Sequence, residues 1–150
     1  MKADRMSADQ ALQDIADYVI DFKVESEEAL NTARNCLIDT IGCGLLALKY
    51  PNCTRHLGPL VPGTTVENGA RVFGKSFELD PVKAAWDIGA LVRWLDFNDT
   101  WLAEEWGHPS DNLGAIMALG DYISRVNIAN HKSPLSIRAV SYTHLRAHET

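Results

Sequence analysis

The chain has 150 residues, of which 46% are hydrophobic and 23% charged, so it can build one sizeable core and is not intrinsically disordered. It carries 14 Lys and Arg against 20 Asp and Glu, with no basic cluster, which argues against a nucleic-acid or anionic-membrane partner. Its longest apolar stretch, Ile41 to Leu48, is too short to span a bilayer. No signal peptide is visible and three cysteines suit a reducing compartment, so we expect a soluble cytoplasmic protein.

The first predicted helix spans about residues 8–21. Ser7 and Gln10 have the spacing of a capping box, and apolar residues, among them Leu12 and Ile15, follow at helical intervals. Ser26 is the predicted N-cap of a second helix over about residues 27–48, with two glutamates in its first turn.

The second helix is apolar on several sides in its C-terminal half and is therefore predicted to lie centrally in the core. Asp39 falls inside this apolar run, so we expect its carboxylate to be hydrogen-bonded. Gly42 and Gly44 allow a neighbouring segment to approach closely, and Cys36 and Cys43 are interpreted as core residues.

Pro51 ends this helix and a turn-rich stretch follows over residues 58–69, after which residues 71–77 are predicted to form a short extended element or hairpin. Asp80 and Pro81 are a cap and first-turn proline for a third helix reaching about Leu95. Its expected inner stripe comprises Val82, Ala85, Trp86, Gly89 and Val92.

A fourth helix is predicted to begin with Ser110 or Asp111 as its cap and to end in a polar loop over residues 127–133. Its expected inner stripe comprises Leu113, Ile116, Met117, Gly120 and Ile123. The pattern predicts a mainly α fold.

The segment from Trp94 to Asn112 is the most unusual, because it holds three of the four tryptophans and five carboxylates between two apolar helices. His108 precedes a predicted helix N-terminus, where free backbone N–H groups and the helix dipole favour an anion. A substrate carboxylate bound there would lie beside His108 as acid or base.

Other residues of this segment complete the predicted site. Asp96 and Asp99 are candidates to orient His108 or bind a substrate hydroxyl, Thr100 to donate a hydrogen bond, and Ser110 to contact substrate at the helix N-terminus. The three tryptophans, Trp94, Trp101 and Trp106, are candidates to exclude water.

Simpler interpretations exist for the same residues. His108 can be a capping or packing residue, and the tryptophans can belong to the core. Residues 96–100 resemble the start of a calcium loop, but the sixth position is Trp101 where glycine is required. Another metal held by Asp96, Asp99 and His108 is the weaker alternative, and we expect no metal.

The chain contains two long motifs, Leu-Asp-Phe-Asn-Asp-Thr-Trp at 95–101 and Glu-Trp-Gly-His-Pro-Ser-Asp-Asn at 105–112, and shorter ones at 36–45, 68–72, 78–85 and 121–125. In this order along the chain, the motifs resemble those of the 2-methylcitrate dehydratases of the MmgE/PrpD family. The resemblance covers residues 8 to 138. Related decarboxylases and epimerases of the family have a shorter loop before His-Pro-Ser.

The resemblance implies a large, mostly helical domain, of which this chain is the N-terminal part, together with a smaller α+β domain that it lacks. It implies a homodimer that eliminates water from a tricarboxylate, 2-methylcitrate, in propionate catabolism, without an iron–sulfur cluster or other cofactor. By motif match, Asp96, Thr100 and His108 fall on active-site positions. A related decarboxylase or epimerase acting on a polycarboxylate such as cis-aconitate, and a non-enzymatic helical interaction module, remain alternatives.

The last eleven residues, Val140 to Thr150, resemble a translated adapter used in transposase-based sequencing libraries. We therefore expect residues 1–139 to be part of the helical domain and 140–150 to be a non-native tail, in which His144 and His148 carry no function. We also expect the 150-residue chain by itself to be inactive.

Overall fold

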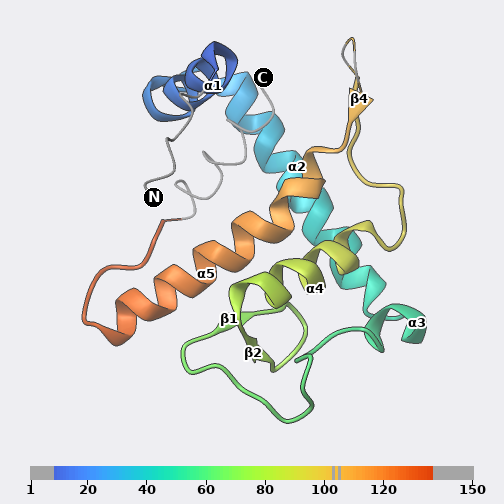
Figure 1. Ribbon diagram of the computed structural model, residues 1–150. Coiled ribbons are helices and arrows are strands. Elements are labelled where there is room, and N and C mark those ends of the chain that lie inside the picture. Colours follow the sequence, from blue (N-terminus) through green and yellow to red (C-terminus); the bar gives the residue numbers. More distant parts are fainter. Residues whose placement is uncertain (1–8, 103, 105, 137–150) are drawn as a thin grey trace, which may run out of the picture.

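The computed structural model describes residues 9–102, 104 and 106–136, and within them the fold is mainly α, as predicted. Four longer helices form the frame (Figure 1): α1 Gln10–Asp21, α2 Glu27–Ala47, α4 Pro81–Arg93 and α5 Leu113–Ala129. A short helix α3, Pro51–Thr54, follows α2, and a 3₁₀ turn η1, Pro109–Asn112, leads into α5. No helix in the described ranges has the length and apolar character that a membrane crossing needs.

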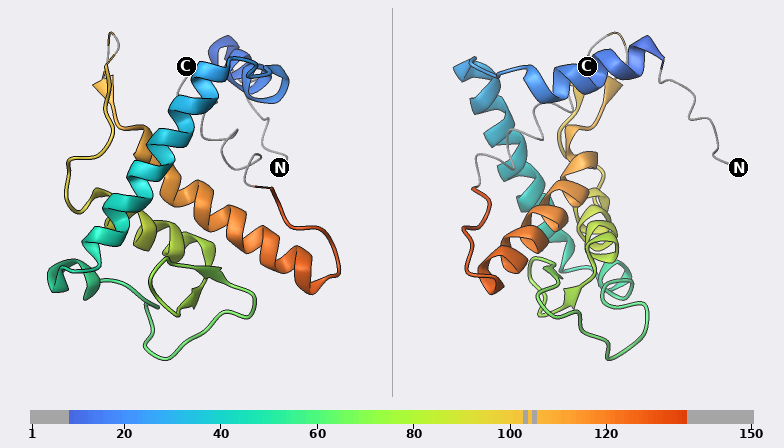
Figure 2. Two further views of the ribbon diagram at one scale, coloured as in Figure 1. Left: turned by 180° about the vertical axis from the view of Figure 1, so that it is seen from behind. Right: turned by 60° about the vertical axis from the view of Figure 1, so that its left-hand side comes forward.

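Two short antiparallel hairpins interrupt the helices. In the first, β1 Ala70–Arg71 pairs with β2 Glu78–Leu79, which confirms a hairpin around residues 71–77 with its strands at the ends of that stretch. In the second, β3 Trp101–Leu102 pairs with β4 Trp106–Gly107, within the segment between α4 and α5. Figure 2 shows the second hairpin projecting away from the helices, on the opposite side from the first.

The core lies where α2 and α5 pack against α4. Ile88, Leu91 and Val92 of α4 are at most 1% exposed, and Ala118 of α5 is fully buried beside them. The two helices approach closely at Gly114, where an added Cβ would lie 2.7 Å from the carbonyl oxygen of Ala85. Because this contact leaves no room for a side chain, Gly114 fixes how near α5 lies to α4.

The predicted N-caps are confirmed for two of the four predicted helices. Ser26 accepts a hydrogen bond from the Ala29 N–H, and Asp80 accepts from the N–H groups of Val82 and Lys83. The first helix, however, begins at Gln10 with Asp9 as its cap, two residues later than predicted. Ser7, the expected cap, lies outside the described residues.

The predicted inner stripe of α4 is wrong in its first half. Val82 is 78% exposed and Trp86 53%, whereas Lys83 and Asp87 are buried. The Lys83 ammonium pairs with the Asp87 carboxylate, which also accepts the Gly58 N–H at 2.8 Å, and Lys83 donates to the carbonyl of His56. This polar cluster holds the loop after α3 against α4. Because Lys83 and Asp87 take the inner face, Val82 and Trp86 face outward.

Asp39 was expected to be hydrogen-bonded because it falls inside the apolar run, but it lies on an exposed side of α2, where water can solvate its carboxylate. The close approach predicted for the two glycines holds at Gly44, where the Phe73 ring fills the space of a Cβ, but not at Gly42, which faces open space. Of the two cysteines interpreted as core, Cys43 is buried and Cys36 half-buried.

The fourth helix begins later and ends later than predicted. Ser110 and Asp111 belong to the 3₁₀ turn, α5 proper starts at Leu113, and it continues through Ala129 into the predicted loop. Within its expected stripe, Leu113 and Gly120 are buried and the other three residues half-buried. Residues 140–150 lie outside the described ranges, and their non-native origin stays a prediction.

Replacing Ile88 by alanine should lower the free energy of unfolding by about 2–5 kcal/mol, because it empties a fully buried position of the core. Val82→Ala, on the same helix but exposed, should change it by less than about 0.5 kcal/mol. Urea unfolding of the two variants measures both effects. Equal losses would contradict the orientation of α4 described above.

Candidate functional site

The segment between α4 and α5 starts and ends on the two most closely packed helices of the structure. It leaves α4 after Arg93, forms the β3–β4 hairpin and returns through His108 into the 3₁₀ turn before α5. Every residue predicted for the site lies on it. Figure 1 shows the hairpin standing beyond the end of α4 and the start of α5, with the chain between α4 and the hairpin looping out to the side.

His108 is held by the backbone of the same segment. Its Nδ1 lies 2.7 Å from the carbonyl oxygen of Asp99 and 3.5 Å from the Thr100 hydroxyl, and its ring meets the edge of Trp106. A carbonyl oxygen only accepts, so the proton of the neutral ring belongs on Nδ1. Nε2 then carries the lone pair and is the nitrogen available as a base.

Asp99 and Ser110 bind one another. The Asp99 carboxylate accepts the Ser110 N–H at 3.0 Å, and the Ser110 hydroxyl, which is buried, accepts from the Asn98 amide at 2.6 Å. The backbone N–H that we expected to be free for a substrate carboxylate is therefore taken by a carboxylate of the chain itself. The Ser110 N–H lies at the start of the 3₁₀ turn, where backbone N–H groups without a partner in the turn favour an anion.

Arg93 is the residue that sequence reasoning missed. Its Nη2 lies 2.6 Å from the Asp96 carboxylate, its Nη1 2.7 Å from the side-chain oxygen Oδ1 of Asn98, and its Nε 3.1 Å from the Asp111 carboxylate. Asn98 was missed as well. A signal existed in the sequence: an arginine in the last turn of a helix, three residues before an aspartate, is positioned to pair with it.

The structure brings four of the predicted site residues into contact with one another, and a fifth, Asp96, is connected to them through Arg93. Asp99, Thr100, His108 and Ser110 form one connected group. Asp96 is 74% exposed at its side chain, takes a left-handed backbone conformation with φ 55°, and is joined to the group through Arg93. The roles assigned to these residues stay predictions.

The tryptophans are neither core nor closed walls of a site in this chain. Trp94 is 40% exposed, Trp101 52% and Trp106 69%. Trp101 and Trp106 stand on the β3–β4 hairpin, where two paired strands offer no second layer for a ring to pack against. The prediction that they belong to the core is wrong, and exclusion of water by them is not observed in this chain.

Two cysteines of α2 lie close enough to this segment for the Asp99 carboxylate to act on their thiols. Burial raises the pKa of the Cys36 thiol, and the carboxylates of Asp99 and Asp39 raise it further. The pKa of the Cys43 thiol is raised by the same three causes. These thiols are therefore kept neutral, as expected of packing residues rather than nucleophiles.

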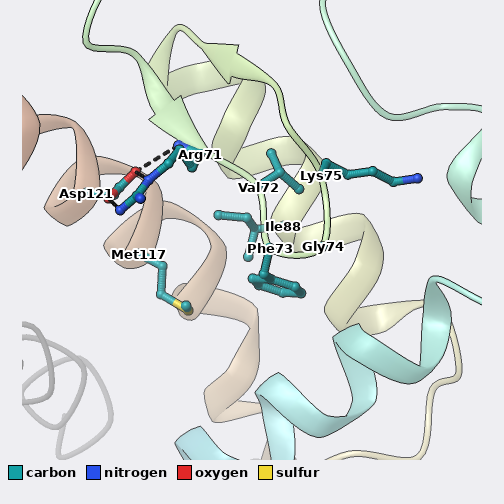
Figure 3. A pocket seen from close by; sticks show the side chains of 8 residues that line it. All are labelled: Arg71, Val72, Phe73, Gly74, Lys75, Ile88, Met117 and Asp121. Atoms are coloured by element: carbon teal, nitrogen blue, oxygen red, sulfur yellow. Dashed lines mark hydrogen bonds and ion pairs between the residues drawn. The ribbon is translucent and has the colours of Figure 1, made fainter.

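Two of the cavities in the described part of the chain lie away from this segment. One, of about 360 Å³, lies between the β1–β2 hairpin, α4 and α5 (Figure 3); it is lined by Arg71, Val72, Phe73, Gly74, Lys75, Ile88, Met117 and Asp121. The other, of about 340 Å³, is lined by His56, Leu60, Asp80, Val82, Lys83 and Trp86. Neither lining includes a predicted site residue. Among the described residues, no three His, Cys, Asp or Glu side chains are grouped to hold a metal ion.

In the first cavity, Arg71 and Asp121 join the hairpin to α5. The Asp121 carboxylate accepts from the Arg71 guanidinium at 2.7 Å and from the Arg71 backbone N–H at 2.8 Å. Burial acts to raise the pKa of Asp121, but these bonds and the charges of Arg71 and Arg125 outweigh it, so the pKa lies below its ordinary value.

Comparison with known proteins gives consistent matches. Residues 13–142 match the model of the MmgE/PrpD N-terminal domain. The chain is 62% identical to a 2-methylcitrate dehydratase of Cupriavidus necator over 98% of its length, and 56% identical to that of Escherichia coli K12 over 97%. A mitochondrial 2-methylcitrate dehydratase of Yarrowia lipolytica is 49% identical over 97%. The chain spans about 30% of the length of these relatives.

Asp121→Asn should destabilise the chain at neutral pH and progressively less as the pH falls below about 4, the ordinary aspartate pKa. The sign follows from the lowered pKa: the stabilisation is present above the unfolded-state pKa and is lost as Asp121 protonates in the folded state. Unfolding midpoints across pH 2–7 measure the difference. In an Arg71→Met background the dependence should vanish or reverse, since burial alone raises this pKa.

The neutral His108 ring should carry its proton on Nδ1. Long-range ¹H–¹⁵N spectra of the imidazole nitrogens at a pH about two units above the ordinary histidine pKa distinguish the two tautomers directly. The exposed His131 supplies an internal reference in the same spectrum. A His108 signal from the Nε2–H form would show that the Asp99 carbonyl does not set the tautomer.

Proposed function

We propose, from the fact that the chain belongs to the MmgE/PrpD family, that it forms part of a hydro-lyase converting 2-methylcitrate to 2-methyl-cis-aconitate. The observation that carries this proposal is the high identity, over nearly the whole chain, to curated 2-methylcitrate dehydratases. The motif at 105–112, with its longer approach to His-Pro-Ser, supports the dehydratase over the family's decarboxylases and epimerases.

The elimination requires two proton transfers. A base removes a proton from the carbon beside the carbinol carbon, the electron pair forms the new double bond, and an acid protonates the departing hydroxyl to give water. His108 is suited to one of these steps, because its Nδ1 is bound to the Asp99 carbonyl and its Nε2 remains able to take or give a proton.

The other predicted residues act around this histidine. Asp96 and Thr100 position the substrate or its leaving hydroxyl, since both present polar side chains from the exposed side of the segment. Asp99 and Ser110 hold the backbone on either side of His108. The Ser110 N–H becomes available to a substrate only if its hydrogen bond to the Asp99 carboxylate opens.

The wider setting follows the same proposal. We infer a homodimeric, cytoplasmic enzyme of propionate catabolism that uses a tricarboxylate substrate and no metal or organic cofactor. Since the chain spans about 30% of its relatives, the proposal concerns the complete polypeptide, and the 150-residue chain alone should show no turnover.

Assaying the complete enzyme with 2-methylcitrate and, separately, with cis-aconitate tests the function. The expected result is formation of an unsaturated tricarboxylate from 2-methylcitrate, followed by ¹H NMR, with no release of CO₂ from cis-aconitate. Decarboxylation of cis-aconitate without dehydration of 2-methylcitrate would assign the chain to the alternative reaction of the family.

His108→Asn in the complete enzyme should lower kcat by roughly 10²–10⁴-fold, the usual effect of removing a general acid or base. Folding should be nearly unchanged, because asparagine can still donate to the Asp99 carbonyl. The matched control is His56→Asn, an exposed histidine beside Arg55, which should retain full activity. Wild-type turnover by His108→Asn would remove this residue from the mechanism.

A further inference from the structure

We infer that Arg93 is a positioning residue of the active site, which sets the distance between Asp96 and the turn that carries His108. This inference rests on the proposed function. Neither the resemblance nor the motif match assigns a role to Arg93. It is carried by the three contacts that one guanidinium makes to three separate parts of the segment between α4 and α5.

At the start of the segment, Arg93 contacts Asp96 through both its side chain and its backbone. Arg93 Nη2 binds the Asp96 carboxylate, and the Asp96 N–H donates to the carbonyl of Arg93 at 3.2 Å, so side chain and backbone meet twice. Asp96 takes a left-handed conformation that is unfavourable for most residues. The contact with Arg93 therefore helps to hold Asp96 where it is.

The other two contacts of the guanidinium connect Arg93 to the end of the segment, one directly through Asp111 and one through Asn98. Arg93 Nε binds the carboxylate of Asp111, in the turn that follows His108. Arg93 Nη1 orients Asn98, whose amide donates to the Ser110 hydroxyl two residues after His108. Asn98 and Ser110 are 7% and 1% exposed, so this link is shielded from water and has a defined geometry.

The geometry of the guanidinium explains why an arginine is suited to this position. Its nitrogens point in fixed directions, and Nε, Nη1 and Nη2 each meet a different acceptor. A lysine ammonium at the same place is a single point and cannot bridge all three acceptors. With a group of the chain at each of its three nitrogens, Arg93 is fitted to brace the loop.

Arg93 and Asp96 also differ in their exposure to solvent. The side chain of Arg93 is 26% exposed, whereas that of Asp96 is 74% exposed. The carboxylate of Asp96 therefore faces solvent on one side while Arg93 holds it on the other. A carboxylate held in this manner keeps its position and remains open to a substrate.

The test compares Arg93→Met and Arg93→Lys with Arg125→Met in the complete enzyme. Arg125 is a matched control, since its side chain is 21% exposed and makes an ion pair with Glu78 at 2.6 Å, away from the segment. We expect Arg93→Met to lower kcat by roughly 10²-fold, as for a misplacement of about 1 Å, with KM changed less than about threefold. Arg93→Lys should recover at most a tenth of wild-type kcat, and Arg125→Met should be near wild type.

Two other results would overturn the inference. Full kcat in Arg93→Lys would show that the charge suffices without the fork geometry, and a rise in KM at unchanged kcat would make Arg93 a substrate ligand. The imidazole ¹⁵N spectrum of His108 in the 150-residue chain is a readout independent of activity. Arg93→Met should reduce the population with the proton on Nδ1, and an unchanged spectrum contradicts the inference even if the wild-type enzyme proves not to dehydrate 2-methylcitrate.

Discussion

The close contact between α4 and α5 at Gly114 is the constraint on which the candidate site depends. A side chain there would collide with the backbone of Ala85 and Gly89, so only glycine lets the two helices pack at this distance. The segment with the predicted site residues starts at the end of one helix and finishes at the beginning of the other. Because the helix pair is rigid, the two ends of the segment are fixed, and short polar contacts are enough to place His108 between them.

Local sequence signals predicted the helices well and their orientation poorly. Ser26 and Asp80 are correct because a cap acts within one turn of its own helix. The inner face of α4 was misjudged because hydrophobic periodicity treats Lys83 and Asp87 as surface residues. They are buried as a pair that also binds the loop at Gly58, a contact 29 residues away that periodicity does not contain. Asp39, expected to need a hydrogen bond within the apolar run, instead lies on an exposed side of α2.

For the site, the sequence located the segment but not its internal contacts. Thr100 and His108 are eight residues apart in one segment whose two ends lie on packed helices, so their proximity could be expected. In the structure they are in contact. Asn98 could not be recognised, since an asparagine among charged and aromatic residues gives no sign that it will be buried against Ser110. Arg93 was overlooked because it belongs to the preceding helix, although the helix end directs its side chain into the segment.

The occupied N–H of Ser110 determines where the polycarboxylate of the proposed reaction can bind. The start of a helix attracts an anion through its free N–H groups, and Asp99 already supplies that anion from within the chain. The backbone carbonyl of Asp99 meanwhile accepts a hydrogen bond from His108 Nδ1. One residue thus satisfies the turn with its side chain and orients the histidine with its backbone, so a substrate carboxylate that displaced Asp99 would also disturb His108. For the proposed reaction, a polycarboxylate substrate is therefore better accommodated on the Nε2 side of His108. Its cationic partners are then expected from outside this segment, because Arg93 is already in contact with Asp96, Asn98 and Asp111.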